Sequence, residues 1–112
     1  MRSRDAKLRD GVQHAVANFI ERESNRTSLI TVTQVHVAAD RKQATIFISV
    51  LPAHKETAAL DFVKRKKGEV RTFLTHELRT RILPRLDFEI DRGEKARQRI
   101  DEILANDDQA KK

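Results

Sequence analysis

The sequence predicts a single α+β domain whose elements follow the order α-β-β-α-kink-α-β-α. Three observations support this class. The chain has 112 residues, which suits one domain. Apolar residues recur at helical spacing in several segments, and three other segments alternate between apolar and polar residues as strands do. We expect the folded domain to span residues 1–106, followed by a short polar tail at 107–112.

The N-terminal half is predicted to form one helix and a β-hairpin. Apolar residues recur every three or four positions over 5–23, which predicts an amphipathic helix. Two strands follow at 29–38 and 44–50, joined by the connection 39–43. The alternation of the first strand changes phase, so we expect a β-bulge near Thr33–Gln34. One face of the second strand should carry Ala44, Ile46, Ile48 and Val50.

A bent pair of helices is predicted in the middle of the chain. Helical spacing covers residues 54–67 and 69–82, and only Gly68 separates the two segments. One residue is too short a connection for a helical hairpin. We therefore expect a kink at Gly68, because glycine readily takes the left-handed conformation that ends many helices. Pro84 should prevent the second helix from continuing.

The C-terminal part should add a third strand at 86–90 and a last helix at 92–105. Three acids, Asp87, Glu89 and Asp91, alternate along this strand, so they should point to one face, which we expect to be solvent-exposed. The periodicities of all these elements predict one shared core that contains Ile46, Ile48, Ala58, Phe62, Phe73, Leu74, Leu78 and Ile100.

Positive charge is concentrated in one part of the chain. The sequence has 23 Lys and Arg against 17 Asp and Glu, a formal net charge of +6. Residues 64–85 hold eight cations and two acids, so eight minus two accounts for the whole excess. A basic excess confined to one structural unit is typical of a polyanion-binding surface, although a solvated helix face can have the same composition. The candidate nucleic-acid-binding residues are Lys64, Arg65, Lys66, Lys67, Gly68, Arg71, Arg79, Arg81 and Arg85.

The sequence offers little for catalysis or metal binding. It has no cysteine, so disulfides and cysteine-ligated zinc are excluded. It has no nucleophile elbow and no Walker loop. The four histidines lie on different predicted elements, without ligand spacing inside any of them: His14, His36, His54 and His76. We expect a protein without enzymatic activity, cofactor, metal or small-molecule substrate.

No segment is typical of a membrane or secreted protein. The longest apolar stretch, Ile46 to Leu51, is interrupted by Ser49 and is far too short to span a bilayer. The first ten residues are charged and no apolar signal core follows them. We expect a monomeric cytoplasmic protein that does not contact membranes.

The bent helix pair is the predicted feature best suited to nucleic acid. In KH domains a Gly-x-x-Gly loop between two helices brings the backbone close to phosphates. This chain has the predicted helix pair and the charge but no Gly-x-x-Gly sequence. Aromatic stacking residues are also few, with five Phe, no Trp and no Tyr. The residues therefore favour a small KH-like binder that depends on cationic side chains and shape, with salt-sensitive affinity and weak base readout.

Three segments carry more specific signatures. They read "ITVTQVHVAADRKQATIFISVL" (30–51), "KKGEVRTFLTHELRTRILPRLDFEID" (66–91) and "RIDEIL" (99–104). The most distinctive patterns are Gly68-x-x-Arg71 and Arg81-x-x-Pro84-x-Leu86-x-Phe88-x-x-Asp91. In these segments, which follow one another in the right order over nearly the whole chain, the protein resembles the bacterial ribosome-binding factor A family.

The resemblance implies a type II KH-like fold, with helices packed on one face of a three-stranded sheet. It also implies binding to the small (30S) ribosomal subunit and its rRNA, and help in the late maturation of 16S rRNA near its 5′ end. Members of the family are non-enzymatic and are linked to cold adaptation. One departure is Lys66, which stands where the family usually has the alanine of Ala-x-Gly, so a long cation replaces a small residue at the bend.

Two other functions remain as alternatives. A general RNA or DNA chaperone of the same fold would bind without subunit specificity. A protein-interaction module would use the first helix and the strands and would leave the basic segment unused.

Overall fold

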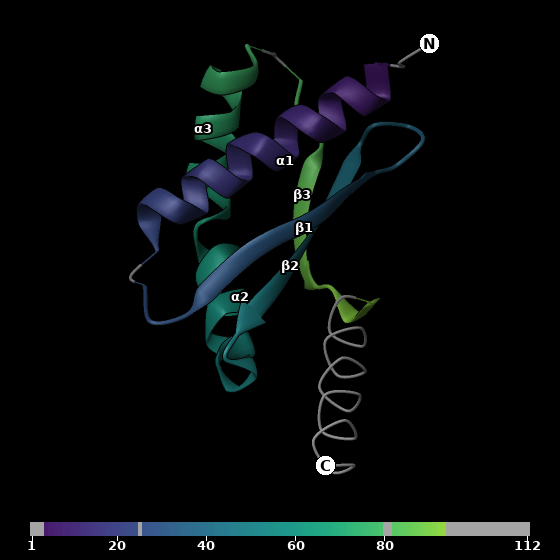
Figure 1. Ribbon diagram of the computed structural model, residues 1–112. Helices are drawn as coiled ribbons and strands as arrows, with labels where there is room; N and C mark the ends of the chain where they lie inside the picture. The colour runs from purple at the N-terminus through teal and green to yellow at the C-terminus, as the bar shows by residue number, and fades with distance from the viewer. Residues whose placement is uncertain (1–3, 25, 80–81, 94–112) are drawn as a thin grey trace, which may run out of the picture.

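The computed structural model describes residues 4–24, 26–79 and 82–93. The elements follow in the order α1 (Arg4–Glu23), β1 (Leu29–Val37), β2 (Gln43–Leu51), the short 3-10 helix η1 (Ala53–Lys55), α2 (Glu56–Arg65), α3 (Lys67–Leu78) and β3 (Arg85–Ile90). Figure 1 shows α1 running across the sheet at an angle, with α2 and α3 following one another along one side. The predicted α+β fold class is confirmed.

The end of the chain mostly falls outside the described residues. Of the helix predicted at 92–105, residues 92 and 93 are described and both are helical. The predicted core residue Ile100, the domain limit at residue 106 and the tail at 107–112 lie outside the described residues.

The sheet has the strand order β1-β2-β3 and mixed direction. Strands β1 and β2 are antiparallel, from Leu29 opposite Leu51 to Val37 opposite Ala44. Strands β2 and β3 are parallel, which requires a long crossover, and α2 and α3 supply it. The register of β1 shifts between Val32 and Gln34, which confirms the predicted bulge.

One face of the sheet and the helices enclose the core. The side chains of β2 alternate, and its buried members are those predicted: Ala44, Ile46, Ile48 and Val50. Helix α1 packs on β1 and α3, and α2 packs on β2 and β3. The largest fully buried side chains include Phe88, Leu86 and Leu74.

The predicted core is right for the strands and partly wrong for the helices. Leu74 is fully buried, while Phe62, Phe73 and Leu78 are partly buried against the core. The prediction for Ala58 was wrong, because it is exposed. The buried residues of α2 are Ala59 and Val63, which face the core in place of Ala58. Adjacent alanines leave the rotation of a helix ambiguous within one residue, about 100°, until its neighbours are known.

The break between the helices lies at Lys66, so the prediction that placed it at Gly68 was wrong. Lys66 has φ −86° and ψ 3°, in the bridge region, where φ is negative and glycine is not required. Its N–H donates to the Phe62 carbonyl at 3.1 Å, and its own carbonyl accepts from Val70 N–H at 2.9 Å. Because hydrogen bonding continues through the turn, no left-handed residue is needed. Gly68 is helical, and none of the glycines in the described residues has a positive φ.

The predicted end of the second helix was also wrong. Helix α3 ends at Leu78, and Arg79 follows in the left-handed conformation with φ 51°. A left-handed residue is a common way to end a helix, although glycine usually supplies it. Ile82, which helical spacing assigned to the inner face, is 83% exposed.

The three acids in and just after β3 do not all face solvent. Glu89 is exposed and Asp87 partly so, but Asp91 is only 6% exposed, which corrects the prediction for that residue. Its Oδ2 accepts hydrogen bonds from the hydroxyl of Thr33 and, at 3.5 Å, from the amide of Gln34. A buried carboxylate needs such donors. Both donors, Thr33 and Gln34, lie at the bulge, so their hydrogen bonds to Asp91 connect the irregular part of β1 to the residue that follows β3.

A glycine that is helical and exposed should be replaceable. We expect Gly68→Ala to raise the free energy of unfolding by about 0.5–1 kcal/mol, because alanine favours the helix and a Cβ at this position meets nothing within 4 Å. Gly11→Ala is the matched contrast, since its methyl group would lie 2.8 Å from Cδ2 of Leu78 and force that side chain to move. Urea unfolding followed by circular dichroism measures both. A destabilised Gly68→Ala variant would show that the bend needs glycine after all.

Candidate nucleic-acid interface

Five of the predicted binding residues, 64–68, lie at the break between α2 and α3. Lys64 and Arg65 form the last turn of α2 and are exposed. Together with Ala58 and Asp61 they line an open depression on the outer side of that helix. Neither cation has a side-chain partner among the described residues. They are therefore available to an external anion.

The two lysines that follow already have acidic partners. Lys66 Nζ lies 3.3 Å from a carboxylate oxygen of Glu69, one turn later in α3. Lys67 Nζ lies 3.4 Å from Asp87 on β3, and Asp87 also accepts a hydrogen bond from the amide of Gln43 at 2.7 Å. Such partly exposed pairs contribute about 0–1 kcal/mol, so a phosphate could displace them, but part of the lysine charge is neutralised in the unbound protein.

Arg71 makes a contact inside the protein. Its Nη1 donates to the Pro84 carbonyl at 2.7 Å, in a partly buried position. This hydrogen bond ties α3 to the segment that leads into β3. Arg71 therefore helps to hold the break against the sheet, whatever it contributes to an RNA surface.

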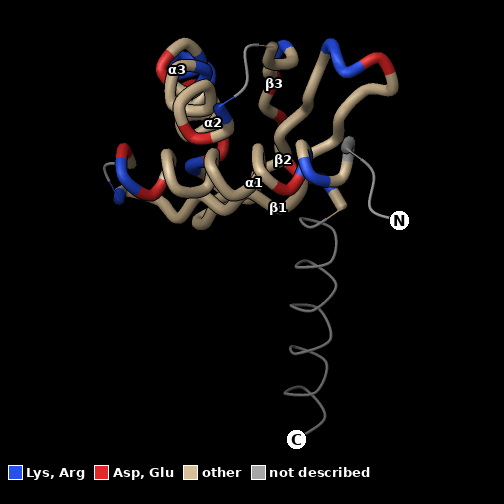
Figure 2. The backbone as a smooth tube through the Cα atoms, turned by 90° about the horizontal axis from the view of Figure 1, so that it is seen from above, with Lys and Arg blue, Asp and Glu red and all other residues tan. Residues whose placement is uncertain are grey.

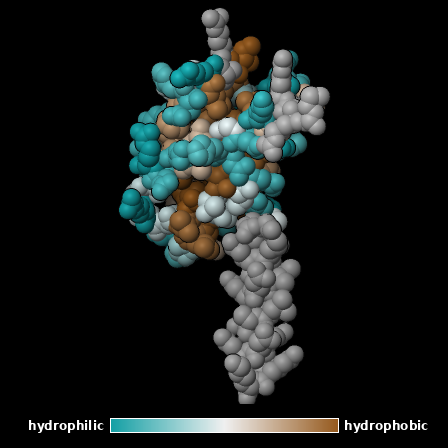
Figure 3. All heavy atoms as spheres, turned by 45° about the horizontal axis from the view of Figure 1, so that its top comes forward, coloured by the Kyte–Doolittle hydropathy of each residue, from teal (hydrophilic) through white to brown (hydrophobic). Residues whose placement is uncertain are grey.

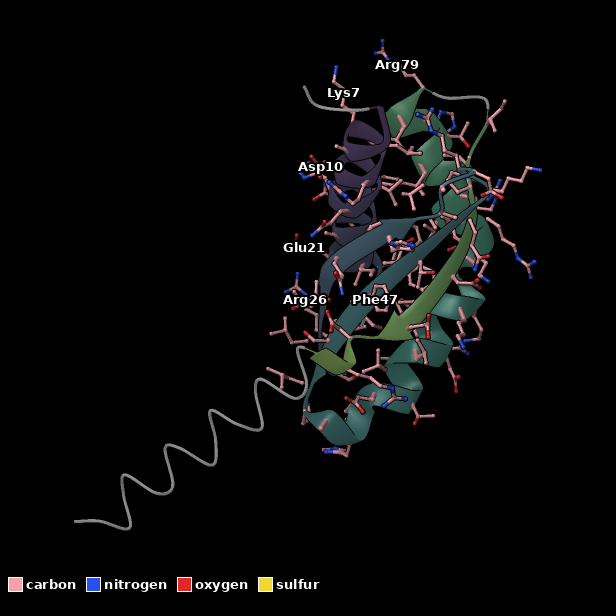
Figure 4. All side chains as sticks on the ribbon, turned by 90° about the vertical axis from the view of Figure 1, so that its right-hand side faces the viewer. Lys7, Asp10, Glu21, Arg26, Phe47 and Arg79 are labelled. Carbon is pink, nitrogen blue, oxygen red and sulfur yellow. The ribbon has the colours of Figure 1, made fainter. Side chains whose placement is uncertain are left out.

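Two more of the predicted cations, Arg79 and Arg85, lie away from the break. Arg79 is exposed at the C-terminus of that helix, at the same end of the molecule as Lys7 of α1 (Figure 4). Arg85 is the exposed first residue of β3. Arg81 lies outside the described residues. The predicted site is thus a set of cations spread from the end of α2 to the start of β3.

Folding brings two further cations to this set. The N–H of Arg85 donates to the carbonyl of Lys42 at 2.8 Å, so β3 begins beside the β1–β2 hairpin and its two cations, Arg41 and Lys42. Figure 2 shows the Lys and Arg positions of the hairpin and of the start of β3 on the same side of the molecule. Sequence reasoning missed Arg41 and Lys42 because they lie outside the basic segment 64–85, and only the pairing of β2 with β3 brings them beside Arg85.

The open face of the sheet is less suited to RNA. Phe47 lies there, between the core-facing Ile46 and Ile48 in sequence, and is partly buried (labelled in Figure 4). In the register of the sheet its neighbours are Gln34 and Glu89. One aromatic ring beside an exposed acid is not a base-stacking platform. Figure 3 shows the molecule from a different side, where hydrophilic side chains cover much of the surface and hydrophobic areas lie between them.

Other kinds of site find no support in the part of the chain that the structure describes. Within it, no group of three or more histidine or acidic side chains is placed to hold a metal ion. No helix in the described ranges is long and apolar enough to cross a membrane.

These features define the class of protein. A small α+β domain with a mixed three-stranded sheet, helices on its apolar face and a basic break between two of them is a KH-like nucleic-acid-binding domain that lacks the Gly-x-x-Gly loop.

The chain belongs to the ribosome-binding factor A family, whose model matches residues 4–104. It is 30% identical over 104 residues to the ribosome-binding factor A of Thermomicrobium roseum, a match that covers 90% of this chain and 81% of that protein. The resemblance stated from the sequence is confirmed.

Solved structures agree with this assignment. The crystal structure of ribosome-binding factor A from Thermus thermophilus superimposes with a TM-score of 0.69 at 25% identity, covering 79% of this chain and 97% of that one. A homology model of the T. thermophilus protein, fitted into the cryo-EM map of a 30S–RbfA complex, gives a TM-score of 0.68 at 25% identity, with coverages of 77% and 93%.

Proposed function

We propose that this protein is a cytoplasmic ribosome assembly factor. In this proposal it binds the immature small (30S) ribosomal subunit as a monomer and assists late maturation of 16S rRNA near its 5′ end. The observation that carries the proposal is family membership over residues 4–104, joined to exposed cations at the helix break. The fit of a relative of similar fold into a 30S complex supports the choice of partner.

The chemistry of the site supports binding without catalysis. Lys64 and Arg65 would contact phosphates, with Lys66 and Lys67 joining them when their carboxylate partners are displaced. Phosphate contacts position a protein on RNA but carry little sequence information. Specificity for the subunit would therefore come from the shape of the folded rRNA. A factor that binds one rRNA conformation more tightly than another shifts the population toward it, and no chemical step is needed.

Co-sedimentation tests the proposed partner. In cell extracts fractionated on sucrose gradients, we expect the protein to travel with free small subunits and to be absent from mature full ribosomes. Equal binding to unrelated RNA would favour the general chaperone, and no binding to any RNA would favour the protein-interaction module.

Depletion tests the proposed role in maturation. Cells without the protein should accumulate 16S precursor with an unprocessed 5′ end, most strongly at low temperature, and primer extension measures this end. Normal 5′ processing in depleted cells, with subunit binding intact, would restrict the function to binding alone.

A further inference from the structure

The tip of the β1–β2 hairpin is basic, and its backbone is hydrogen-bonded. Its turn is closed by hydrogen bonds from Arg41 N–H to the Ala38 carbonyl and from Ala38 N–H to the Gln43 carbonyl, both 2.8 Å. The carboxylate of Asp40 accepts from the backbone N–H of Lys42 at 2.9 Å, and Arg41 holds a left-handed conformation with φ 61°. The hairpin therefore presents its cations from a fixed backbone.

The start of β3 completes this cluster. Arg85 lies opposite Gln43 in the parallel register, and its N–H bonds the carbonyl of Lys42. Residues 41, 42 and 85, here called the tip cluster, are all exposed. The ammonium of Lys42 and the guanidinium of Arg85 have no side-chain partner among the described residues. The backbone contacts place these two residues side by side, and neither side chain is neutralised by a described residue.

Acids near the cluster are already engaged. Asp40 accepts the Lys42 backbone N–H. Asp87, two residues beyond Arg85, is held by Gln43 and by Lys67. The Lys67–Asp87 pair also links the helix break to β3, so the tip cluster and the end of α2 lie on either side of this neutralised link. The surface thus has two cationic ends joined by a neutral middle.

We propose that the tip cluster is a second phosphate-contact site, so that the domain holds the rRNA backbone at the hairpin as well as at the helix break. This inference rests on the proposed function. Arg85 offers a planar fork that matches a phosphate in two hydrogen bonds, and Lys42 offers a compact point charge. Because the backbone that carries the two cations is already hydrogen-bonded, binding need not order the main chain at this site, which lowers the conformational cost of the contact.

The test measures binding to purified immature small subunits over a series of salt concentrations. In the Lys42→Ala, Arg85→Ala double variant, we expect the slope of log affinity against log salt to fall by about 1.4–1.8 units, because each lost phosphate contact removes about 0.7–0.9. The substitutions leave the backbone hydrogen bond in place, so circular dichroism and the melting temperature should stay close to wild type.

A charge-matched control is available on α1. Lys7 and Arg9 are exposed, and Lys7→Ala with Arg9→Ala removes the same formal charge, although Arg9 Nε lies 3.9 Å from Oδ1 of the exposed Asp10. We expect the control to keep the wild-type slope. An equal fall in both double variants would mean that net charge alone matters, which would overturn the tip site.

Failure of this inference is distinguishable from failure of the proposed function. If the tip variant keeps the wild-type slope while loss of Lys64 and Arg65 lowers it, the tip site is wrong and subunit binding stands. If the wild-type protein does not bind small subunits at all, the proposed function itself is wrong, and the test of the tip cluster on small subunits does not apply.

Discussion

Phe88→Ala should lower the free energy of unfolding by about 3–5 kcal/mol. Phe88 is 1% exposed and lies opposite Ile46 in the parallel register of β2 and β3. Removing the ring leaves a cavity between the sheet and the helices that the strands cannot close. Domains of this size are stable by about 5–15 kcal/mol, so the variant should be close to unfolded at moderate urea.

Phe73→Ala is the informative comparison. Phe73 is only partly buried, with its ring centroid 5.8 Å from that of Phe19 and 5.5 Å from the guanidinium carbon of Arg22. We therefore expect a loss of about 2 kcal/mol, closer to the transfer term alone. The chain has no Trp or Tyr, so circular dichroism follows unfolding better than fluorescence does.

If Phe88→Ala does not fold at all, a milder substitution at the same position still tests the packing of β3. Phe88→Leu keeps most of the apolar volume and should cost less than Phe88→Ala. A loss below about 1 kcal/mol in Phe88→Ala would show that β3 is not packed on the core as described.

Loss of Lys64 and Arg65 should weaken binding more than loss of the neighbouring pair Lys66 and Lys67. In the Lys64→Ala, Arg65→Ala variant we expect the salt slope for small-subunit binding to fall by about 1.4–1.8 units, since both side chains are exposed and without partners among the described residues. The fold should be unaffected, because neither side chain contributes to the core.

Variants of Lys66 and Lys67 test whether these lysines bind RNA or stay paired with their acids. Lys66→Ala with Lys67→Ala should lower the slope by less, because phosphate must first displace Glu69 and Asp87. Glu69→Gln should in turn strengthen binding by releasing Lys66. An equal or larger fall in the Lys66, Lys67 variant would show that both lysines leave their acids for RNA. An unchanged slope in both double variants would place the RNA on another surface.

Local patterns were sufficient where the structure depends on near neighbours. The strands, the hairpin and the bulge near Thr33 follow from alternation with a period of two, because a one-residue slip would turn every side chain of a strand to the other face. The concentration of cations around residues 64–71 was likewise visible in the sequence alone.

Local patterns failed for the position of the helix break, the buried face of α2 and the end of α3, which depend on contacts with the rest of the fold. Gly68 is the strongest local signal for a break, yet the turn occurs at Lys66, whose φ is negative and does not require glycine. Ala58 and Ala59 are equally apolar, so only packing against the sheet decided which of them is buried. Helix α3 ended before the predicted position because Arg79 is left-handed. The sequence has no glycine near residue 79 that would have predicted this end.

By itself, then, the sequence determined the α+β class, the strands, the helix pair and the basic character of the segment between residues 64 and 85. The tertiary structure alone decided which of those cations are available. It paired Lys66 with Glu69 and Lys67 with Asp87, turned Arg71 to a backbone carbonyl, and brought Lys42 beside Arg85. The physical reason is that a residue's charge is known from its type, whereas its neutralisation depends on which distant groups folding places within a few ångströms.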